Sequence, residues 1–512
     1  MDRRDFLYKS LALLPAMRAA SGRSIDLEEA TLAGLEQGFS SGKFTSRSVS
    51  EWYLARIDSM DKKGPKVNAV IELNPEALSI ADALDRERSA KGPRGSMHGV
   101  PILIKDNIDT ADRMTTTAGS LALEGSIAAR DAAVVERLRA AGAVILGKTN
   151  LSEWANFRSA HSVSGWSGRG RQTLNPYALD RNPSGSSSGT GAAVASSFCA
   201  VGVGTETDGS VTAPASVCGL VGIKPTIGLI GGSGIIPISH SQDTAGPLAR
   251  TVRDAAILLG AMAVPGKQQD FTKFLDPQGL KGARLGVERK YFGANAETDR
   301  LMEECLAEMK RQGAVIVDPA NLPSHGKYDE DEMEVLLYEF KADLNTYLGA
   351  LPPSARVHSL ADVIKFNRDH AREEMPYFEQ ETMERAEKKG PLTEKAYLDA
   401  RAKCLRLSRA EGIDAVLAKY KLQAILAPTT APAPLNDFVL GDPNLPACTT
   451  PPAVAGYPHV TVPAGLVRGL PVGISFIGTA FSEPALLKLA SGFEQATKAR
   501  RRPKFLPSAE IG

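Results

Sequence analysis

Hydrophobic and polar residues alternate along the first third of the chain with two different periods. Residues 46–57 have the polar start and the three- and four-residue apolar spacing of a capped helix. Short apolar runs rich in β-branched residues at 67–71, 100–104 and 143–146 are typical of buried strands, and a helical pattern at 131–141 separates the last two. This alternation predicts an α/β fold with a central mixed, mostly parallel sheet that helices cover on both faces.

The rest of the chain continues this pattern without an obvious break. Residues 165–250 are rich in Gly, Ser and Thr, and residues 325–420 are charged and strongly helical. Strand-like runs at 424–427 and 460–462 precede a closing helix at 484–497. Because we find no internal repeat and no long polar linker, we expect residues 23–512 to form a single large domain.

The first 22 residues resemble a twin-arginine signal peptide. Arg3 and Arg4 precede a short apolar stretch at 11–17, which Pro15 interrupts. The pattern predicts export to the periplasm or secretion. The alternative is an ordinary amphipathic N-terminus in a cytoplasmic protein. No later stretch reaches the 18 or so uninterrupted apolar residues that a spanning helix needs, so we expect no membrane span.

Charge and composition exclude several classes of function. Lys+Arg 60 against Asp+Glu 59 leaves a net charge of +1, so no global field favours a nucleic acid partner. The 5 cysteines are an odd number without a CxxC pair, and the 7 histidines are scattered without an HExxH motif. We therefore expect neither a disulfide framework nor a bound metal.

Three segments carry candidate chemistry. Residues 99–106 form an apolar strand that ends in Lys105, residues 185–191 form a Gly/Ser-rich loop before a helix, and residues 204–211 place Ser210 in a glycine-containing turn. Each segment alone has an ordinary explanation: a lysine that reaches water, a flexible linker, and a plain β-turn. A turn of the third kind can also point several backbone N–H groups at one position, as an oxyanion site requires.

Together the three segments resemble the amidase signature family, and the resemblance extends over about residues 25–500. Ser186 and Ser210 lie 24 residues apart, and the segment Gly222-Ile223-Lys224-Pro225-Thr226 follows, as is usual in that family. Many members have two glycines before the second serine, whereas here Asp208 precedes Gly209. This variant looks like the branch that contains bacterial peptide amidases.

The resemblance implies a Ser-Ser-Lys relay that works without a cofactor. Ser210 would attack an amide carbonyl, Ser186 would take its proton, and Lys105 would accept the proton from Ser186. For this, Lys105 must be uncharged part of the time, and burial on an apolar strand lowers the pKa of a lysine. The resemblance further implies a cis Gly185–Ser186 peptide, support from the Ser187 side chain, and an oxyanion hole formed by the backbone N–H groups of Thr207, Asp208, Gly209 and Ser210.

Several alternatives compete with this interpretation. The run 185–189 also fits the GxSxG elbow of α/β-hydrolases, with Ser187 as nucleophile and His459 as its base, but that leaves Lys105 and Ser210 without a role. The other candidates are an aryl or aliphatic acylamidase, the amidase subunit of a glutamine-dependent tRNA amidotransferase, and a binding protein that has lost turnover. We expect an enzyme that deamidates peptide C-terminal carboxamides and acts as a monomer or homodimer on a small-molecule or peptide amide. Substrate choice is expected to reside in the helical region 325–420 and in loops near 231–241 and 429–446.

Overall fold

The computed structural model describes residues 26–510, so the predicted signal peptide at 1–22 lies outside the described residues. Its centre is an 11-stranded sheet with the strand order β1-β3-β2-β4-β6-β5-β10-β11-β9-β7-β8. The strands are β1 (Val70–Leu73), β2 (Pro101–Lys105), β3 (Val144–Thr149), β4 (Val201–Glu206), β5 (Val221–Lys224), β6 (Thr244–Ala249), β7 (Arg284–Val287), β8 (Val315–Val317), β9 (Ala424–Pro428), β10 (His459–Val467) and β11 (Leu470–Ile477).

The sheet is mixed, as predicted, but it is not mostly parallel. Among the neighbouring pairs in the described chain, β2–β3, β2–β4, β7–β8 and β7–β9 are parallel. The other 6 pairs are antiparallel. The prediction of a mostly parallel sheet was wrong. It assumed that the alternation of strands and helices in the first third, which gives parallel pairs, continues along the whole chain. In the middle of the sheet, strands follow turns and loops, as at the Arg468–Gly469 turn between β10 and β11.

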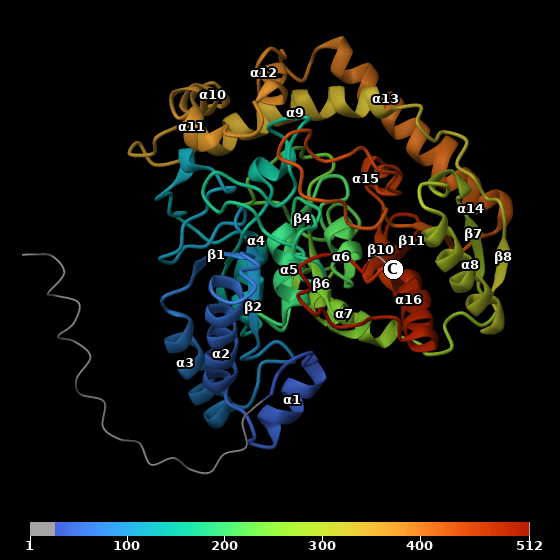
Figure 1. Cartoon of the computed structure of the whole chain (residues 1–512), viewed down its shortest axis with the longest axis horizontal. Helices are drawn as coiled ribbons and strands as arrows, with labels where there is room; N and C mark the ends of the chain where they lie inside the picture. Colours follow the sequence, from blue (N-terminus) through green and yellow to red (C-terminus); the bar gives the residue numbers. More distant parts are fainter. Residues whose placement is uncertain (1–25, 511–512) are drawn as a thin grey trace, which may run out of the picture.

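Helices surround this sheet (Figure 1). The first group of helices comprises α1 (Leu32–Ser40), α2 (Ser46–Arg56), α3 (Ala77–Lys91), α4 (Ala133–Ala140), α5 (Ser188–Ala195), α6 (Thr212–Val217), α7 (Val252–Met262), α8 (Ala296–Arg311), α14 (Asp414–Tyr420), α15 (Thr450–Ala455) and α16 (Glu483–Thr497). The predicted helix at 46–57 is α2. It begins after Thr45, whose side chain accepts from the Ser48 N–H in a capping box.

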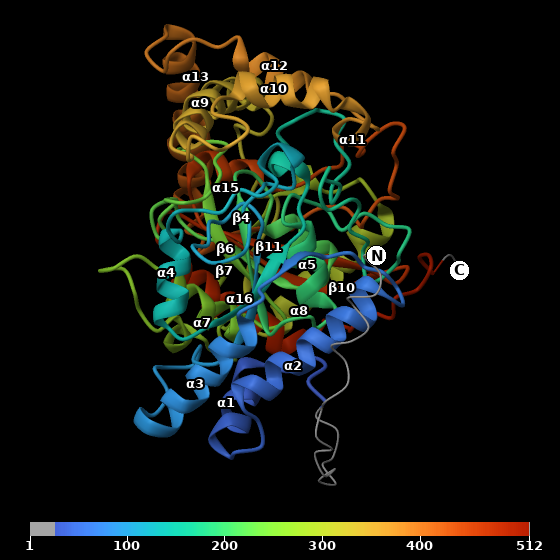
Figure 2. The ribbon, with the colours of Figure 1, turned by 90° about the vertical axis from the view of Figure 1, so that its left-hand side faces the viewer.

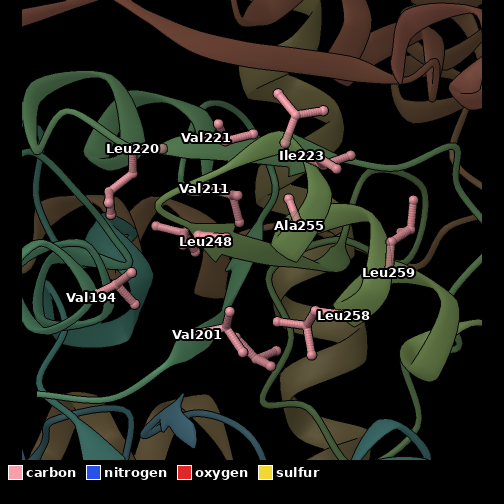
Figure 3. Close-up of a cluster of buried hydrophobic side chains, with 14 of the residues drawn as sticks. Val194, Val201, Val211, Leu220, Val221, Ile223, Leu248, Ala255, Leu258 and Leu259 are labelled. Atoms are coloured by element: carbon pink, nitrogen blue, oxygen red, sulfur yellow. The ribbon is translucent and has the colours of Figure 1, made fainter. Parts of the chain in front are cut away.

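Strand β4 shows how the central sheet receives helices on both faces. A Cβ atom at Gly202 would lie 2.6 Å from Thr190 of α5, so this glycine permits the close approach of that helix. Because side chains alternate along a strand, Val201 and Val203 point to the opposite face. Figure 3 shows Val201 close to Leu258 of α7, within the main buried cluster. Strand β4, which leads into the turn that carries Ser210, is thus packed on both faces.

A second group of helices lies over one end of the sheet. It consists of α9 (Asp329–Gly349), α10 (Leu360–Asp369), α11 (Ala371–Glu374), α12 (Glu381–Glu387) and α13 (Lys395–Ser408). Figures 1 and 2 both show these helices along the top of the molecule. Among residues 26–510, no helix combines the length and the apolar composition required to cross a bilayer.

A buried arginine joins this helical group to the rest of the protein. The Arg158 side chain is fully buried, and its Nη1 atom donates to Glu153 Oε1 over 2.6 Å. Its guanidinium lies 4.1 Å from the ring centroid of Phe378, which precedes α12. Glu374 of α11 in turn accepts from the Ser120 hydroxyl at 3.0 Å. These buried polar contacts fix the position of the helices relative to the sheet.

Candidate active site

Lys105 is the last residue of β2, and its side chain has no solvent exposure. Its Nζ atom lies 2.7 Å from Ser186 Oγ, 2.9 Å from Thr205 Oγ1 and 3.2 Å from the Thr205 carbonyl oxygen. The contact with Ser186 connects residues 81 positions apart. This contact forms because β2 and β4 are neighbouring parallel strands, so their carboxyl ends lie at the same end of the sheet. The Gly/Ser-rich loop crosses that end. The structure therefore brings together the first two predicted site residues.

The loop that carries Ser186 is ordered by its own backbone and by its neighbours. The Gly185–Ser186 peptide is cis, as the family resemblance implied. The Ser186 carbonyl accepts from the Ser152 N–H at 3.1 Å, and α5 begins two residues later. A Cβ atom on Gly185 would lie 2.2 Å from Ser152 Oγ, so this position has room for glycine only. The segment is a fixed part of the site rather than a flexible linker.

The turn that carries Ser210 is closed by the carboxylate of Glu206. One oxygen of this side chain accepts from the backbone N–H groups of Val211 and Thr212, at 2.7 and 2.9 Å. Gly209 adopts a φ of +77°, a left-handed conformation that strains other residues. Within the described chain, the backbone N–H groups of residues 207–210 donate to no protein acceptor. An oxyanion hole requires backbone donors that protein acceptors leave free, so these N–H groups are candidates for that role.

Ser210 lies next to the Lys105–Ser186 pair through the backbone. Its carbonyl accepts from the Ser187 N–H at 3.1 Å, and the residue is 8% exposed. The turn and the loop are thus directly joined by this backbone hydrogen bond. All three members of the predicted relay lie in one region.

Burial determines the charge state of Lys105. Removal of its amine from water lowers the pKa from 10.5 to about 7, against the attraction of the carboxylates of Asp243 and Glu206, which favour the ammonium. Asp243 is itself buried, and desolvation raises its pKa to about 6. At neutral pH about half of the Lys105 side chains are therefore uncharged and able to accept a proton.

The structure also tests the elbow interpretation. The Ser187 hydroxyl makes two hydrogen bonds to the backbone of Thr205. It donates to the Thr205 carbonyl oxygen at 3.1 Å and accepts from the Thr205 N–H at 3.2 Å. His459, the base that this interpretation requires, is buried in β10 and hydrogen-bonded to Ser475 Oγ at 2.6 Å. Burial lowers the pKa of its imidazole to about 3. The Ser187 hydroxyl is thus held by the Thr205 backbone, and His459 belongs to a different network.

Three residues of the site gave no signal in the sequence. Thr205 accepts from Lys105 Nζ, Asn107 donates from Nδ2 to Thr205 Oγ1 at 3.0 Å, and the Asp243 carboxylate accepts from the Thr207 hydroxyl at 2.5 Å. Thr205 lies within the segment 204–211, Asn107 lies two residues after Lys105, and Asp243 directly precedes β6, but none of these side chains was predicted to act in the site. Only the position of Asn107, two residues after Lys105 at a strand end, could have indicated it.

A cavity of about 340 Å³ opens beside these residues. Its lining combines the strand ends, residues 227–238 and α9, and it comprises Asn107, Ala155, Thr205, Thr207, Ile227, Gly228, Ile230, Gly231, Gly232, Ile235, Ile236, Pro237, Ile238, His240, Asp243, Thr244 and Asp343. At its rim, His240 contacts Asp343 at 2.9 Å and approaches Glu339. These three side chains are close enough to share an ion. However, Glu339 already accepts from the hydroxyls of Ser239 and Tyr397.

The sequence is similar to known amidases and to amidotransferase subunits. The Amidase family pattern matches residues 49–487. A probable amidase of Arabidopsis thaliana is 42% identical, over 98% of this chain and 97% of its own length. A glutamyl-tRNA(Gln) amidotransferase subunit of Exiguobacterium sibiricum is 35% identical, over 89% of this chain and 96% of its own length.

Solved structures agree with these sequence matches. The native peptide amidase of Stenotrophomonas maltophilia is 48% identical, with a TM-score of 0.89 over 94% of this chain and 99% of that chain. Fold, sequence and the buried lysine at the strand end therefore point to the same conclusion. The chain belongs to the Amidase family and hydrolyses linear amide C–N bonds.

Proposed function

We propose that this protein is a peptide amidase that removes the C-terminal carboxamide of peptides through a Ser-Ser-Lys relay. The observation that carries the proposal is the 2.7 Å contact between Ser186 Oγ and the buried amine of Lys105, whose pKa lies near 7. A serine hydroxyl is a weak nucleophile and requires a base. An arginine could not serve, because its guanidinium stays protonated.

The reaction proceeds through an acyl-enzyme. Ser210 Oγ attacks the carbonyl carbon while its proton passes to Ser186 and the Ser186 proton passes to Lys105. The backbone N–H groups of residues 207–210 stabilise the resulting oxyanion, each such donor contributing about 3–4 kcal/mol to the transition state. The proton then returns through Ser186 to the leaving nitrogen, ammonia departs, and water hydrolyses the ester by the same route in reverse.

The relay is tested by removing its members one at a time. Ser210→Ala and Lys105→Ala should abolish turnover of a peptide amide, and Ser186→Ala should reduce kcat/KM by several orders of magnitude. Circular dichroism of each variant checks that the fold survives. Activity that persists in Ser210→Ala but is lost in Ser187→Ala would replace the relay with the elbow mechanism.

A substrate panel tests the class of amide. Release of ammonia from peptide amides, fatty amides and anilides is measured with the purified chain alone. We expect peptide amides to have the highest kcat/KM, which the 48% identity to a peptide amidase supports. Activity that appears only after a second protein chain is added would favour an amidotransferase subunit instead.

We also propose that the protein is exported through its N-terminal arginine pair. Arg3 and Arg4 lie outside the described residues, so the support is the sequence pattern alone. Cells that produce the full chain are fractionated, with and without the change of both arginines to lysine. Retention of the double variant in the cytoplasm is expected, and unchanged export would exclude the twin-arginine route.

A further inference from the structure

A short segment of the chain lies between α9 and the turn that carries Ser210. It consists of residues 239–243, which we call the connecting segment, and it directly precedes β6. The Ser239 carbonyl closes this segment by accepting from the backbone N–H groups of Gln242 and Asp243, at 3.1 and 2.8 Å. The proposed relay involves only Asp243 from this segment and leaves its other residues without a role.

The connecting segment is held along one face of α9 by three carboxylates. The hydrogen bonds run from Gln242 Nε2 to Glu332 (2.8 Å), from the Ser241 N–H to Glu339 (3.1 Å) and from the His240 N–H to Asp343 (2.8 Å). The three acceptors are seven and four residues apart, so they lie on the same face of the helix. The segment is therefore fixed to the helical group.

The same segment also holds Thr207, the first residue of the predicted oxyanion turn. Gln242 Nε2 donates to the Thr207 carbonyl oxygen at 3.4 Å, in addition to its bond with α9. The Asp243 carboxylate accepts from the Thr207 hydroxyl at 2.5 Å. Gln242 is 2% exposed and Thr207 is 8% exposed, so both bonds are shielded from bulk water. Two adjacent residues of the connecting segment thus hold the backbone and the side chain of Thr207.

The direction of the Thr207 carbonyl determines the direction of the next N–H group. The Thr207–Asp208 peptide bond is trans. In a planar trans peptide, the carbonyl of one residue and the N–H of the next point in opposite directions. Because Gln242 holds the carbonyl on one side, the Asp208 N–H points to the other, and within the described chain it donates to no protein acceptor. This N–H is one of the candidate oxyanion donors.

We infer that Gln242 is a positioning residue: it holds the Thr207 carbonyl so that the Asp208 N–H points into the oxyanion hole, and it anchors this donor to α9 through Glu332. The inference rests on the proposed relay, because an oxyanion forms in the hole only if Ser210 attacks the amide. On this assignment the helical group affects kcat as well as substrate choice, because its first long helix supports an oxyanion donor.

The first test separates stabilisation of the transition state from substrate binding. Gln242→Leu removes the donor to Thr207 and keeps a side chain of similar size. Complete loss of an oxyanion donor costs about 10²–10³ in kcat, so kcat for a peptide amide should fall by about tenfold to a thousandfold. KM should change by less than about threefold. Gln242→Asn, whose amide is one methylene shorter, should act in the same direction and replaces the leucine variant if that variant does not fold.

Two inhibitors built on one peptide give a readout that a purely structural role would leave unchanged. With a peptide aldehyde, Ser210 Oγ bonds to the aldehyde carbon, its proton passes to Ser186, and the carbonyl oxygen becomes the oxyanion. The corresponding peptide alcohol forms no oxyanion. In Gln242→Leu the Ki of the aldehyde should rise by the factor by which kcat/KM falls, while the Ki of the alcohol stays the same. An equal rise of both Ki values would mean that Gln242 only supports the fold, and the inference would be wrong.

The matched control is the same change at another buried glutamine of the helical group. Gln380 is also 2% exposed, and its Nε2 atom donates to the Ile364 carbonyl at 3.1 Å. Gln380→Leu should lower the melting temperature without changing the ratio of the two Ki values. A change in that ratio equal to the change in Gln242→Leu would show that any buried glutamine of this region has the same effect, which would overturn the assignment.

The anchor on α9 is tested at Glu332. Burial and the nearby carboxylate of Asp208 raise the pKa of Glu332 well above its usual range, so a glutamine resembles its protonated form. Glu332→Gln keeps an acceptor for Gln242 and should retain kcat, whereas Glu332→Leu removes the acceptor and should lower kcat and weaken the aldehyde together. Unchanged kcat in Glu332→Leu would show that α9 does not anchor the donor.

Failure of the inference can be told apart from failure of the proposed function. If Ser210→Ala retains turnover, the relay is wrong and the inference fails with it. If Ser210→Ala is inactive while Gln242→Leu has the kcat of the wild-type enzyme, the relay stands and only the inference fails.

Discussion

The pH dependence of kcat/KM tests the charge state of Lys105 most directly. A lysine with the ordinary pKa of 10.5 is neutral in only roughly 0.03% of molecules at pH 7, whereas a pKa of about 7 makes about half of them neutral. Burial thus increases the population of the neutral Lys105 amine, the base of the proposed relay, by about a thousandfold. The neutral form is lost as the pH falls, so activity should decrease about tenfold for each pH unit below 6.

The assay is kcat/KM for one peptide amide between pH 5 and 10, at constant ionic strength. We expect a plateau above pH 8 and a value at pH 5 about a hundredfold below it. Stability at each pH is checked by preincubation and assay at pH 8. A midpoint near 10 would mean that Lys105 is not desolvated in the working enzyme, and a flat profile would remove lysine as the base.

Three further changes give measurable outcomes. Asp243→Asn removes a negative charge that favours the ammonium of Lys105, so the acidic midpoint should move to lower pH; a shift to higher pH would contradict the assigned electrostatics. Ser187→Ala removes two hydrogen bonds to Thr205, and kcat should fall about tenfold without being abolished, as measured with the same peptide amide. Arg158→Ala leaves Glu153 buried without its partner, and the free energy of unfolding in urea should drop by about 3–5 kcal/mol; a loss below 1 kcal/mol would show that the pair is not needed.

Local patterns predicted most elements but not how the strands pair. The runs at 100–104, 143–146 and 424–427 are β2, β3 and β9, because a buried strand is apolar throughout. Their direction depends on contacts between residues far apart, which periodicity does not contain. The sequence therefore predicted a sheet with helices but not that most of its pairs are antiparallel.

The site was predictable to the extent that a family resemblance supplied it. Lys105 and Ser186 are 81 residues apart, and nothing in their spacing indicates contact. The contribution of Asp243 could not be found, since it acts through burial and charge rather than through a motif. Arg158 was missed because charged residues are almost never fully buried, and only the surrounding carboxylate and rings make its position favourable.

The three oxygen neighbours of the Lys105 amine have a consequence for the direction of the hydrogen bonds. An ammonium has three hydrogens and no lone pair, so it donates to Ser186 and twice to Thr205. After one proton is lost, two hydrogens remain for Thr205 and a lone pair faces Ser186. In the proposed relay, the hydroxyl of Ser186 then rotates and donates to the nitrogen, which frees its own oxygen to receive hydrogen from Ser210. On that proposal, deprotonation of a single amine reverses the direction of the hydrogen bonds along the relay and prepares Ser210 for attack.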